Sequence, residues 1–374
     1  MGLEQESNRK QNIDEYEEQN AILKSRPPIL FLELTRNCNL SCRMCRTNGK
    51  YNPEWDMTSE TINQVFAEIV PYVSLVDLRG WGESTILNGF SSILIKTILA
   101  GAKVRVVTNG ICMTPELWET MFSSDNVVTI SVDAASEELF LKLRGGSLST
   151  IVKNIKEGIS IRNRLGKGRI YLNAVVSKNN LKELPNILRL GSSLNIDKVV
   201  LFPLISKRAN RNHLCWAKKE IVPVLEELMN ESGGLKTPVQ LGASLDESLT
   251  IAGSLPSICT HPWSHIYVDY MGDIGFCDHL IGRNGFTLGS LKDCSFEEIL
   301  NNLKFINLRR AHMEAKYSRI LTPEFWPCTW CYHNRYVDFE HELYPSLERK
   351  LVSTENSGRL YLTNKERFPI YSFI

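Results

Sequence analysis

Short apolar runs alternate with amphipathic segments along the first half of the chain. Runs rich in branched and aromatic residues predict β-strands at residues 29–34, 75–78, 104–107, 127–133, 169–177 and 198–204. Apolar residues spaced three or four positions apart predict helices between them, at residues 58–70, 89–99, 115–122, 149–165 and 181–194. Alternating strands and helices predict the α/β class, a parallel sheet with its functional site at the carboxyl ends of the strands.

The pattern is different near both ends of the chain. Residues 267–276 predict two short strands around a turn that contains a glycine, and a helix follows from about residue 295 to 315. These elements predict a small α+β unit after the α/β part. Residues 1–27 are rich in acidic side chains and predict a partly helical, solvated arm.

Composition narrows the class of protein. The chain has 374 residues, with 43 Lys plus Arg against 42 Asp plus Glu, so its charge implies neither a nucleic acid nor an anionic membrane as partner. The apolar runs are far shorter than the ~20 residues of a membrane span, and the first residues contain no apolar signal region. We expect a soluble cytoplasmic protein with no membrane association.

The spacing of the ten cysteines carries the chemistry. Cys38, Cys42 and Cys45 form a C-x3-C-x2-C sequence directly after the first predicted strand. Three thiolates on one short loop can hold three irons of a [4Fe-4S] cluster, whereas a structural zinc site would need a fourth ligand nearby. The fourth iron is then open to another ligand.

This loop resembles that of the radical S-adenosylmethionine (SAM) enzymes, in which it follows the first strand of a partial (β/α)6 barrel. The resemblance implies that SAM chelates the open iron and is cleaved to methionine and a 5′-deoxyadenosyl radical, which takes a hydrogen atom from the substrate. The family usually has an aromatic residue before the third cysteine, next to the adenine. Here that residue is Met44, which is also apolar and polarizable.

Further features of this family follow in the same order. The sequence Gly-Trp-Gly-Glu after the second strand resembles the family's Gly-Gly-Glu, and Thr-Asn-Gly closes the third strand. Taken alone, the Gly-Trp-Gly-Glu sequence would be an ordinary turn. The alternative for Arg144, in the helix after the fourth strand, is a solvated charge at a helix end. The resemblance implies a SAM-binding set of Met44, Gly80, Gly82, Glu83, Asn109, Ser131, Asp133 and Arg144.

A second cysteine set lies in the C-terminal part. Cys259 and Cys277 are followed by the C-x2-C pair Cys328 and Cys331. This layout resembles the Twitch domain, the shortened form of the SPASM domain, and implies one auxiliary [4Fe-4S] cluster with four protein ligands. A structural tetrathiolate zinc is the alternative, because the same ligands would suffice.

The resemblance divides the chain into five regions. These are an N-terminal arm (1–27), a radical SAM partial barrel (28–205), a bridging segment (206–255), an auxiliary-cluster domain (256–340) and a C-terminal tail (341–374).

The auxiliary cluster bears on the type of reaction. A cluster with four protein ligands has no open iron for substrate, so electron transfer is its natural use. The ligand layout resembles that of Twitch-containing alcohol dehydrogenases that act on aminocyclitols. It implies the oxidation of an alcohol on a small polar natural-product intermediate, with an external one-electron donor such as flavodoxin or ferredoxin.

Three alternatives remain open at this stage. A radical epimerase would use a free cysteine as hydrogen-atom donor, for which Cys112 and Cys215 are the candidates. Modification of a ribosomal peptide is disfavoured because the N-terminal arm is too short for a peptide-recognition domain. A protein that uses its clusters only for structure or electron transfer would not cleave SAM.

Overall fold

The computed structural model describes most of the barrel and much of the auxiliary domain. The described residues are 2–45, 51–204, 258–277, 280, 286–316, 318, 320–329 and parts of 223–241. Two predicted site residues, Cys215 and Cys331, lie outside them, as do the C-terminal tail and most of the bridging segment.

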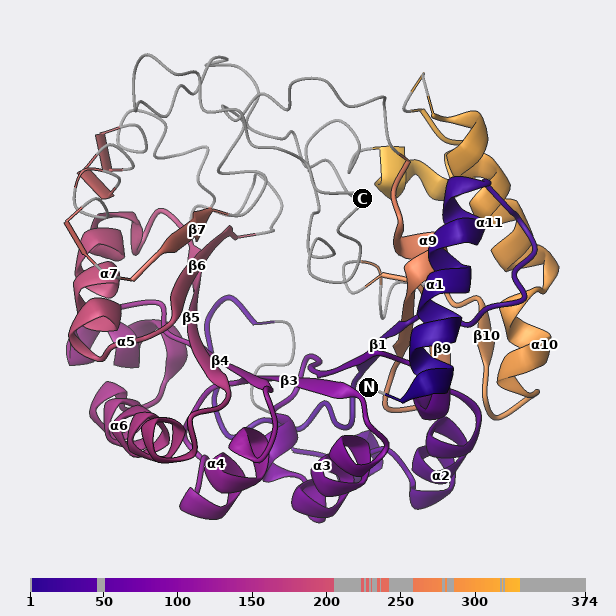
Figure 1. The fold of residues 1–374 in the computed structure, drawn as a ribbon. Helices are drawn as coiled ribbons and strands as arrows, with labels where there is room; N and C mark the ends of the chain where they lie inside the picture. Colours follow the sequence, from indigo (N-terminus) through magenta and orange to yellow (C-terminus); the bar gives the residue numbers. More distant parts are fainter. Residues whose placement is uncertain are drawn as a thin grey trace.

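One sheet of ten strands organises the described part of the chain, in the order β10-β9-β8-β1-β2-β3-β4-β5-β6-β7. All neighbours from β8 to β7 in this order are parallel, and the sheet curves into an open barrel (Figure 1). The barrel strands are β1 (Ile29–Leu32), β2 (Leu75–Leu78), β3 (Lys103–Thr108), β4 (Val127–Ser131), β5 (Arg169–Val176), β6 (Lys198–Pro203) and β7 (Val239–Leu241). The parallel α/β partial barrel that the sequence predicts is confirmed.

Helices cover the outer side of this sheet (Figure 1). They are α2 (Ser59–Glu68), α3 (Phe90–Leu99), α4 (Pro115–Phe122), α5 (Glu137–Arg144), α6 (Leu148–Leu165) and α7 (Leu184–Ser193). Side-chain caps fix several starts, because Thr58, Thr114 and Ser147 each accept a hydrogen bond from the first turn. Short 3-10 helices lie at Pro53–Trp55, Val70–Tyr72, Ser84–Ile86, Leu181–Glu183 and Pro323–Phe325.

The two faces of each barrel strand differ in chemistry. Outward residues such as Val104, Ile130 and Leu172 are almost completely buried against the helices. Alternate residues face the barrel interior and include polar groups, among them Asp77 and Arg105, which form an ion pair. The outer layer therefore stabilises the fold, and the inner face is left for function.

The auxiliary unit joins the barrel through backbone pairing. Strand β8 (His265–Val268) lies parallel to β1, with Ile29 opposite His265. A turn at Gly272, whose φ is +86°, leads into antiparallel β9 (Asp273–Gly275), as the sequence predicts, and β10 (Gly289–Ser290) follows. The small domain therefore extends the barrel sheet beyond β1.

The predicted helix at 295–315 is two helices, α10 (Phe296–Leu300) and α11 (Leu303–Glu314), preceded by the short α9 (His261–Ser264). The break has a local cause, because the Asn302 side chain accepts a hydrogen bond from the backbone N–H of Phe305 and begins a new helix.

Residues 1–27 contain the helix α1 (Leu3–Glu17), but its expected solvation is wrong. A polar stripe along this helix is buried: Gln5, Asn8, Asn12, Glu15 and Tyr16. Asn8 donates to the Tyr72 carbonyl beside the barrel, and the Tyr16 hydroxyl donates to the Ile258 carbonyl at 2.7 Å. Hydrogen bonds and the edge-on contact of the Tyr16 ring with Trp263 fix this helix. Because most of its buried side chains are polar, hydrophobic periodicity does not reveal its burial.

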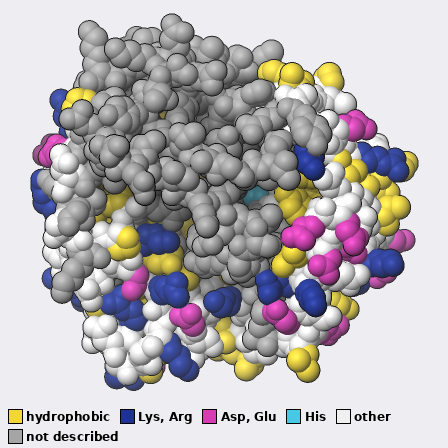
Figure 2. Space-filling model, turned by 45° about the horizontal axis from the view of Figure 1, so that its top comes forward, with side chains coloured by type: hydrophobic (Ala, Val, Ile, Leu, Met, Phe, Trp, Pro, Cys, Tyr) yellow, Lys and Arg dark blue, Asp and Glu magenta, His cyan; other side chains and the backbone are white. Residues whose placement is uncertain are grey.

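Two surface properties bear on possible partners. Figure 2 shows basic and acidic side chains interspersed on the described part of one face, in keeping with the net charge of +1. Within the same described residues, no helix has both the length and the apolar character needed to cross a bilayer.

Candidate active site

The cysteine loop leaves the end of β1 and packs against the strand ends. Cys38, Cys42 and Cys45 are all partly buried, and the Cys38 sulfur accepts the Leu40 N–H at 3.5 Å. Burial raises the pKa of the Cys38 thiol to about 11 and also raises that of Cys42. Iron binding would have to displace these protons, because the thiolate is the ligand.

Glycine is required where the Gly-Trp-Gly-Glu loop approaches this region. A Cβ on Gly82 would lie 2.4 Å from the Thr35 carbonyl oxygen and 2.5 Å from that of Asn37. A Cβ on Gly80 would lie 2.4 Å from Cγ of Glu33. The loop after β2 therefore lies directly against the segment that leads into the cysteines, and the predicted contact of these glycines with SAM stays a prediction.

Glu83 connects two predicted SAM-binding motifs. Its carboxylate is buried, and it accepts hydrogen bonds from the hydroxyl of Thr85 at 2.6 Å, the hydroxyl of Thr108 at 2.7 Å and the N–H of Asn109 at 2.6 Å. Burial raises the pKa of this carboxyl, and these donors oppose that rise. Glu83 therefore fixes the end of β3 to the loop after β2; its contact with SAM stays a prediction.

The Thr-Asn-Gly segment contacts the cysteine loop directly. The Asn109 amide donates to Oδ1 of Asn39 at 2.7 Å and lies 3.9 Å from the Cys38 sulfur. The Asn39 amide in turn donates to the sulfur of Cys112 at 3.4 Å. Cys112, a candidate hydrogen-atom donor, is thus held against the cysteine loop.

Asp133 and Arg144 form a buried ion pair, with Nε to Oδ2 at 2.6 Å. The other Asp133 oxygen accepts the Val175 N–H, which ties β4 to β5. Arg144 is 8% exposed and lies at the end of α5, near Cys42. Its positive charge lowers the pKa of the Cys42 thiol and so opposes the rise that burial causes. Arg144 is therefore not a solvated helix-end charge.

Asn173 is an interior residue to which the sequence assigns no role. It is opposite Ser131 in the β4–β5 register, close to the carboxyl ends of both strands. Its Oδ1 is buried without a hydrogen-bond partner in the part of the chain that the structure describes. Polar residues alternating with apolar ones along β5 were the available signal. Met44, also predicted near SAM, packs partly buried against the main core.

The auxiliary cysteines come from separate segments. Cys259 precedes α9, Cys277 follows β9, and Cys328 is buried in the last described segment. None of the eight cysteines that the structure describes is in a disulfide, and these residues include no group of three or more His, Cys, Asp or Glu that could hold a single metal ion. The donor chemistry of both sets, soft thiols without carboxylates, fits iron–sulfur clusters.

Comparisons with known proteins agree with this donor chemistry. Residues 32–190 match the radical SAM superfamily, and residues 259–337 match the SPASM iron–sulfur cluster-binding domain.

Curated relatives have diverse activities. A probable GTP 3′,8-cyclase of Sulfurisphaera tokodaii is 26% identical over 54% of this chain and 63% of its own length. A mycofactocin maturase of Mycolicibacterium smegmatis is 29% identical over 46% of this chain and 45% of its own. An AdoMet-dependent heme synthase of Methanosarcina barkeri is 25% identical over 78% of this chain and 86% of its own length. The chain thus spans less than two thirds of the length of the GTP 3′,8-cyclase and of the mycofactocin maturase.

Solved structures share the fold. SuiB of Streptococcus suis, bound to SAM, superposes with a TM-score of 0.64 at 16% identity, covering 82% of this chain and 72% of SuiB. The AdoMet-bound anSMEcpe superposes with a TM-score of 0.60 at 14% identity, covering 82% and 87%. Residues 32–190 are therefore a radical SAM domain and residues 259–337 a SPASM-type domain, and the two imply a SAM-binding [4Fe-4S] cluster and an auxiliary iron–sulfur cluster.

Proposed function

We propose that this enzyme removes two electrons from its substrate, oxidising an alcohol of a small polar intermediate such as a sugar or aminocyclitol. The observation that carries the proposal is the parallel pairing of β8 with β1. It supports an auxiliary cluster close to the strand that leads into Cys38, where an electron acceptor is needed.

The chain's own residues have distinct tasks in this proposal. When bound, SAM and its cluster would supply a 5′-deoxyadenosyl radical, which takes a hydrogen atom from the substrate. The auxiliary cluster would supply the acceptor for the second electron. Cys38, Cys42 and Cys45 hold the first cluster, and Cys259, Cys277, Cys328 and Cys331 hold the second. Interior polar groups, such as Thr129 and Asn173, are suited to orient a hydroxylated substrate by hydrogen bonds. An external one-electron donor, flavodoxin or ferredoxin, would reduce the SAM-binding cluster.

Anaerobic reconstitution tests this proposal. We expect about eight irons per chain and formation of 5′-deoxyadenosine with dithionite and SAM. With a panel of sugars and aminocyclitols, mass spectrometry should find a product that has lost two hydrogens. A product that gains solvent deuterium and keeps its mass formula would contradict oxidation and indicate epimerisation.

Peptide maturation is the second candidate. Mycofactocin maturases are among the sequence relatives, and SuiB, which shares the fold, has been solved with its precursor peptide. This candidate predicts that 5′-deoxyadenosine formation is stimulated by a peptide and not by small alcohols.

A further inference from the structure

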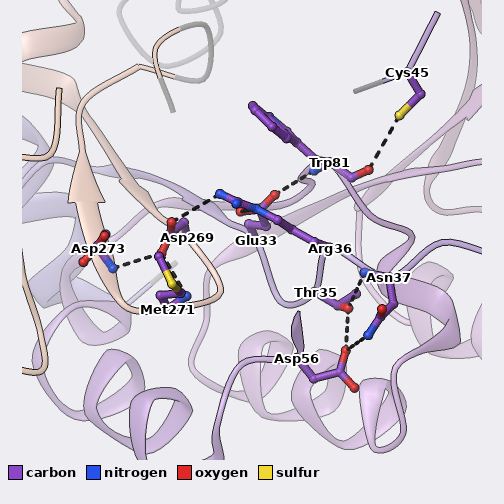
Figure 3. Close-up of polar contacts among 10 residues, drawn as sticks. All are labelled: Glu33, Thr35, Arg36, Asn37, Cys45, Asp56, Trp81, Asp269, Met271 and Asp273. Carbon is purple, nitrogen blue, oxygen red and sulfur yellow. Dashed lines mark hydrogen bonds and ion pairs between the residues drawn. The ribbon is translucent and has the colours of Figure 1, made fainter. Parts of the chain in front are cut away.

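Arg36 lies between the SAM-binding part of the barrel and the auxiliary hairpin. Its guanidinium is 5.0 Å from the ring centre of Trp81 and 4.6 Å from that of Tyr270. It also forms ion pairs with Glu33 at 3.4 Å and with Asp269 at 3.5 Å (Figure 3). We call these five residues the Arg36 bridge.

One end of the bridge fixes the Gly-Trp-Gly-Glu loop. Glu33 is fully buried, and its Oε1 accepts the backbone N–H of Trp81 at 2.8 Å. Gly80 leaves no space between its backbone and the Glu33 side chain. The Trp81 carbonyl oxygen then lies 3.9 Å from the sulfur of Cys45, so the contacts continue to a cluster ligand (Figure 3).

The other end fixes the turn between β8 and β9. Asp269 is 3% exposed, and its Oδ1 accepts the N–H groups of Met271 at 2.9 Å and Asp273 at 3.0 Å. These bonds shape the turn that begins β9, and β9 leads directly to Cys277. The contacts therefore run from one cysteine site to the strand that positions the other.

Only arginine has the shape for this position. Its planar group can stack on two aromatic rings while its edge reaches carboxylates on both sides, whereas the lysine ammonium is a point charge. The Arg36 side chain is 19% exposed, and a partly buried charge network of this kind is weak evidence for added stability. Its geometric specificity favours a role in positioning.

We propose that Arg36 is a positioning residue that sets the geometry between the SAM-binding cluster and the auxiliary cluster. This inference rests on the proposed function, in which the second electron of the substrate passes to the auxiliary cluster and the two clusters must keep a fixed separation. Arg36 contacts neither SAM nor substrate in this role, so any effect on SAM cleavage would pass through the loop at residues 80–83.

The test compares Arg36→Ala and Arg36→Lys with a matched control. Arg164→Ala removes an arginine from an exposed ion pair with Glu119, far along the chain from either cysteine set. Hydrogen exchange is measured on metal-free protein, and pulsed electron paramagnetic resonance measures the inter-cluster distance distribution after dithionite reduction.

The control should match wild type in all measurements. Arg36→Ala should keep its iron and show a distance distribution about twofold broader than that of wild type. Exchange should accelerate about tenfold or more in both residues 80–83 and 269–273. Arg36→Lys should lie between Arg36→Ala and wild type.

The possible results separate this inference from the proposed function. An unchanged distance distribution in Arg36→Ala, or faster exchange in only one of the two loops, overturns the bridge. If Arg36→Ala loses iron, the same criteria apply to Arg36→Lys. A wild-type protein with one cluster contradicts the proposed function instead, and the exchange measurement still decides whether Arg36 joins the two loops.

Discussion

The two cysteine sites are built in opposite ways. Cys38, Cys42 and Cys45 lie on one loop that follows one strand, and neighbouring strand ends support it through Glu83 and Asn109. The described auxiliary cysteines come from three segments: Cys259 precedes α9, Cys277 follows β9, and Cys328 lies in the last described segment. In a site on one loop, the spacing of the residues along the sequence determines which ligands lie close together. In a site assembled from distant segments, this depends on how the strands pair.

Separate removal of each set should give the largest difference between the two sites. Changing Cys38, Cys42 and Cys45 to Ala should leave about four irons and abolish 5′-deoxyadenosine formation. Changing Cys259 and Cys277 to Ala should also leave about four irons, but SAM cleavage should persist. Iron analysis and a dithionite assay measure both. Equal loss of SAM cleavage in the two variants would contradict separate tasks for the sites.

The loop-based site should be highly sensitive to one methyl group. In Gly82→Ala the new Cβ would lie 2.4 Å from the Thr35 carbonyl oxygen, so the loop must move. We expect the 5′-deoxyadenosine rate to fall about 100-fold, because small displacements of reacting groups have effects of that size. Gly2→Ala is the control, because a Cβ there would make only an ordinary contact, 3.8 Å from the Gln5 side-chain oxygen. A normal rate in Gly82→Ala would show that the close approach is not needed.

The region between the two sites should show a pH-dependent stability. Burial raises the pKa of Glu33 from its ordinary value of 4.5 to about 7, so between these pH values the folded state holds a proton that the unfolded state has lost. The free energy of unfolding should therefore fall as pH rises from 4.5 to 7, by up to about 3 kcal/mol, and then level off.

Urea unfolding of the metal-free protein between pH 5 and 8 measures this slope. Glu33→Gln is the matched variant, because its side-chain oxygen can still accept the Trp81 N–H without titrating. The variant should lose most of the slope. If both proteins show the same slope, Glu33 is not its source.

The smallest expected effect concerns the auxiliary side. Tyr16→Phe removes the hydrogen bond to the Ile258 carbonyl, next to Cys259, and leaves a buried acceptor without its donor. We expect a loss of about 1–2 kcal/mol in the free energy of unfolding and little change in SAM cleavage. Denaturant titration and the 5′-deoxyadenosine assay test the two parts independently. A large loss of SAM cleavage would show that α1 supports the barrel site as well.

Much of the barrel is readable from the sequence because its strands and helices have strong local periodicity. The cysteine loop and the glycines of its neighbour are readable for the same reason, since their spacing is local. Arg36 was missed because its partners Asp269 and Tyr270 are reached only through the pairing of β1 with β8. Glu33 was missed because its partner, the Trp81 N–H, lies in the loop after β2, distant in sequence. The buried face of α1 was missed because it consists of polar residues that hydrogen bonds satisfy.

The pairing of β1 with β8 also has a consequence for synthesis and folding. Ile29 leaves the ribosome long before its neighbour His265, so one edge of β1 has no partner during most of translation. An unpaired apolar edge is a site for aggregation, and contacts between distant residues slow folding. Chains cut before residue 265 should therefore aggregate even though they contain every strand of the barrel, because the auxiliary domain supplies the strand that covers this edge of β1.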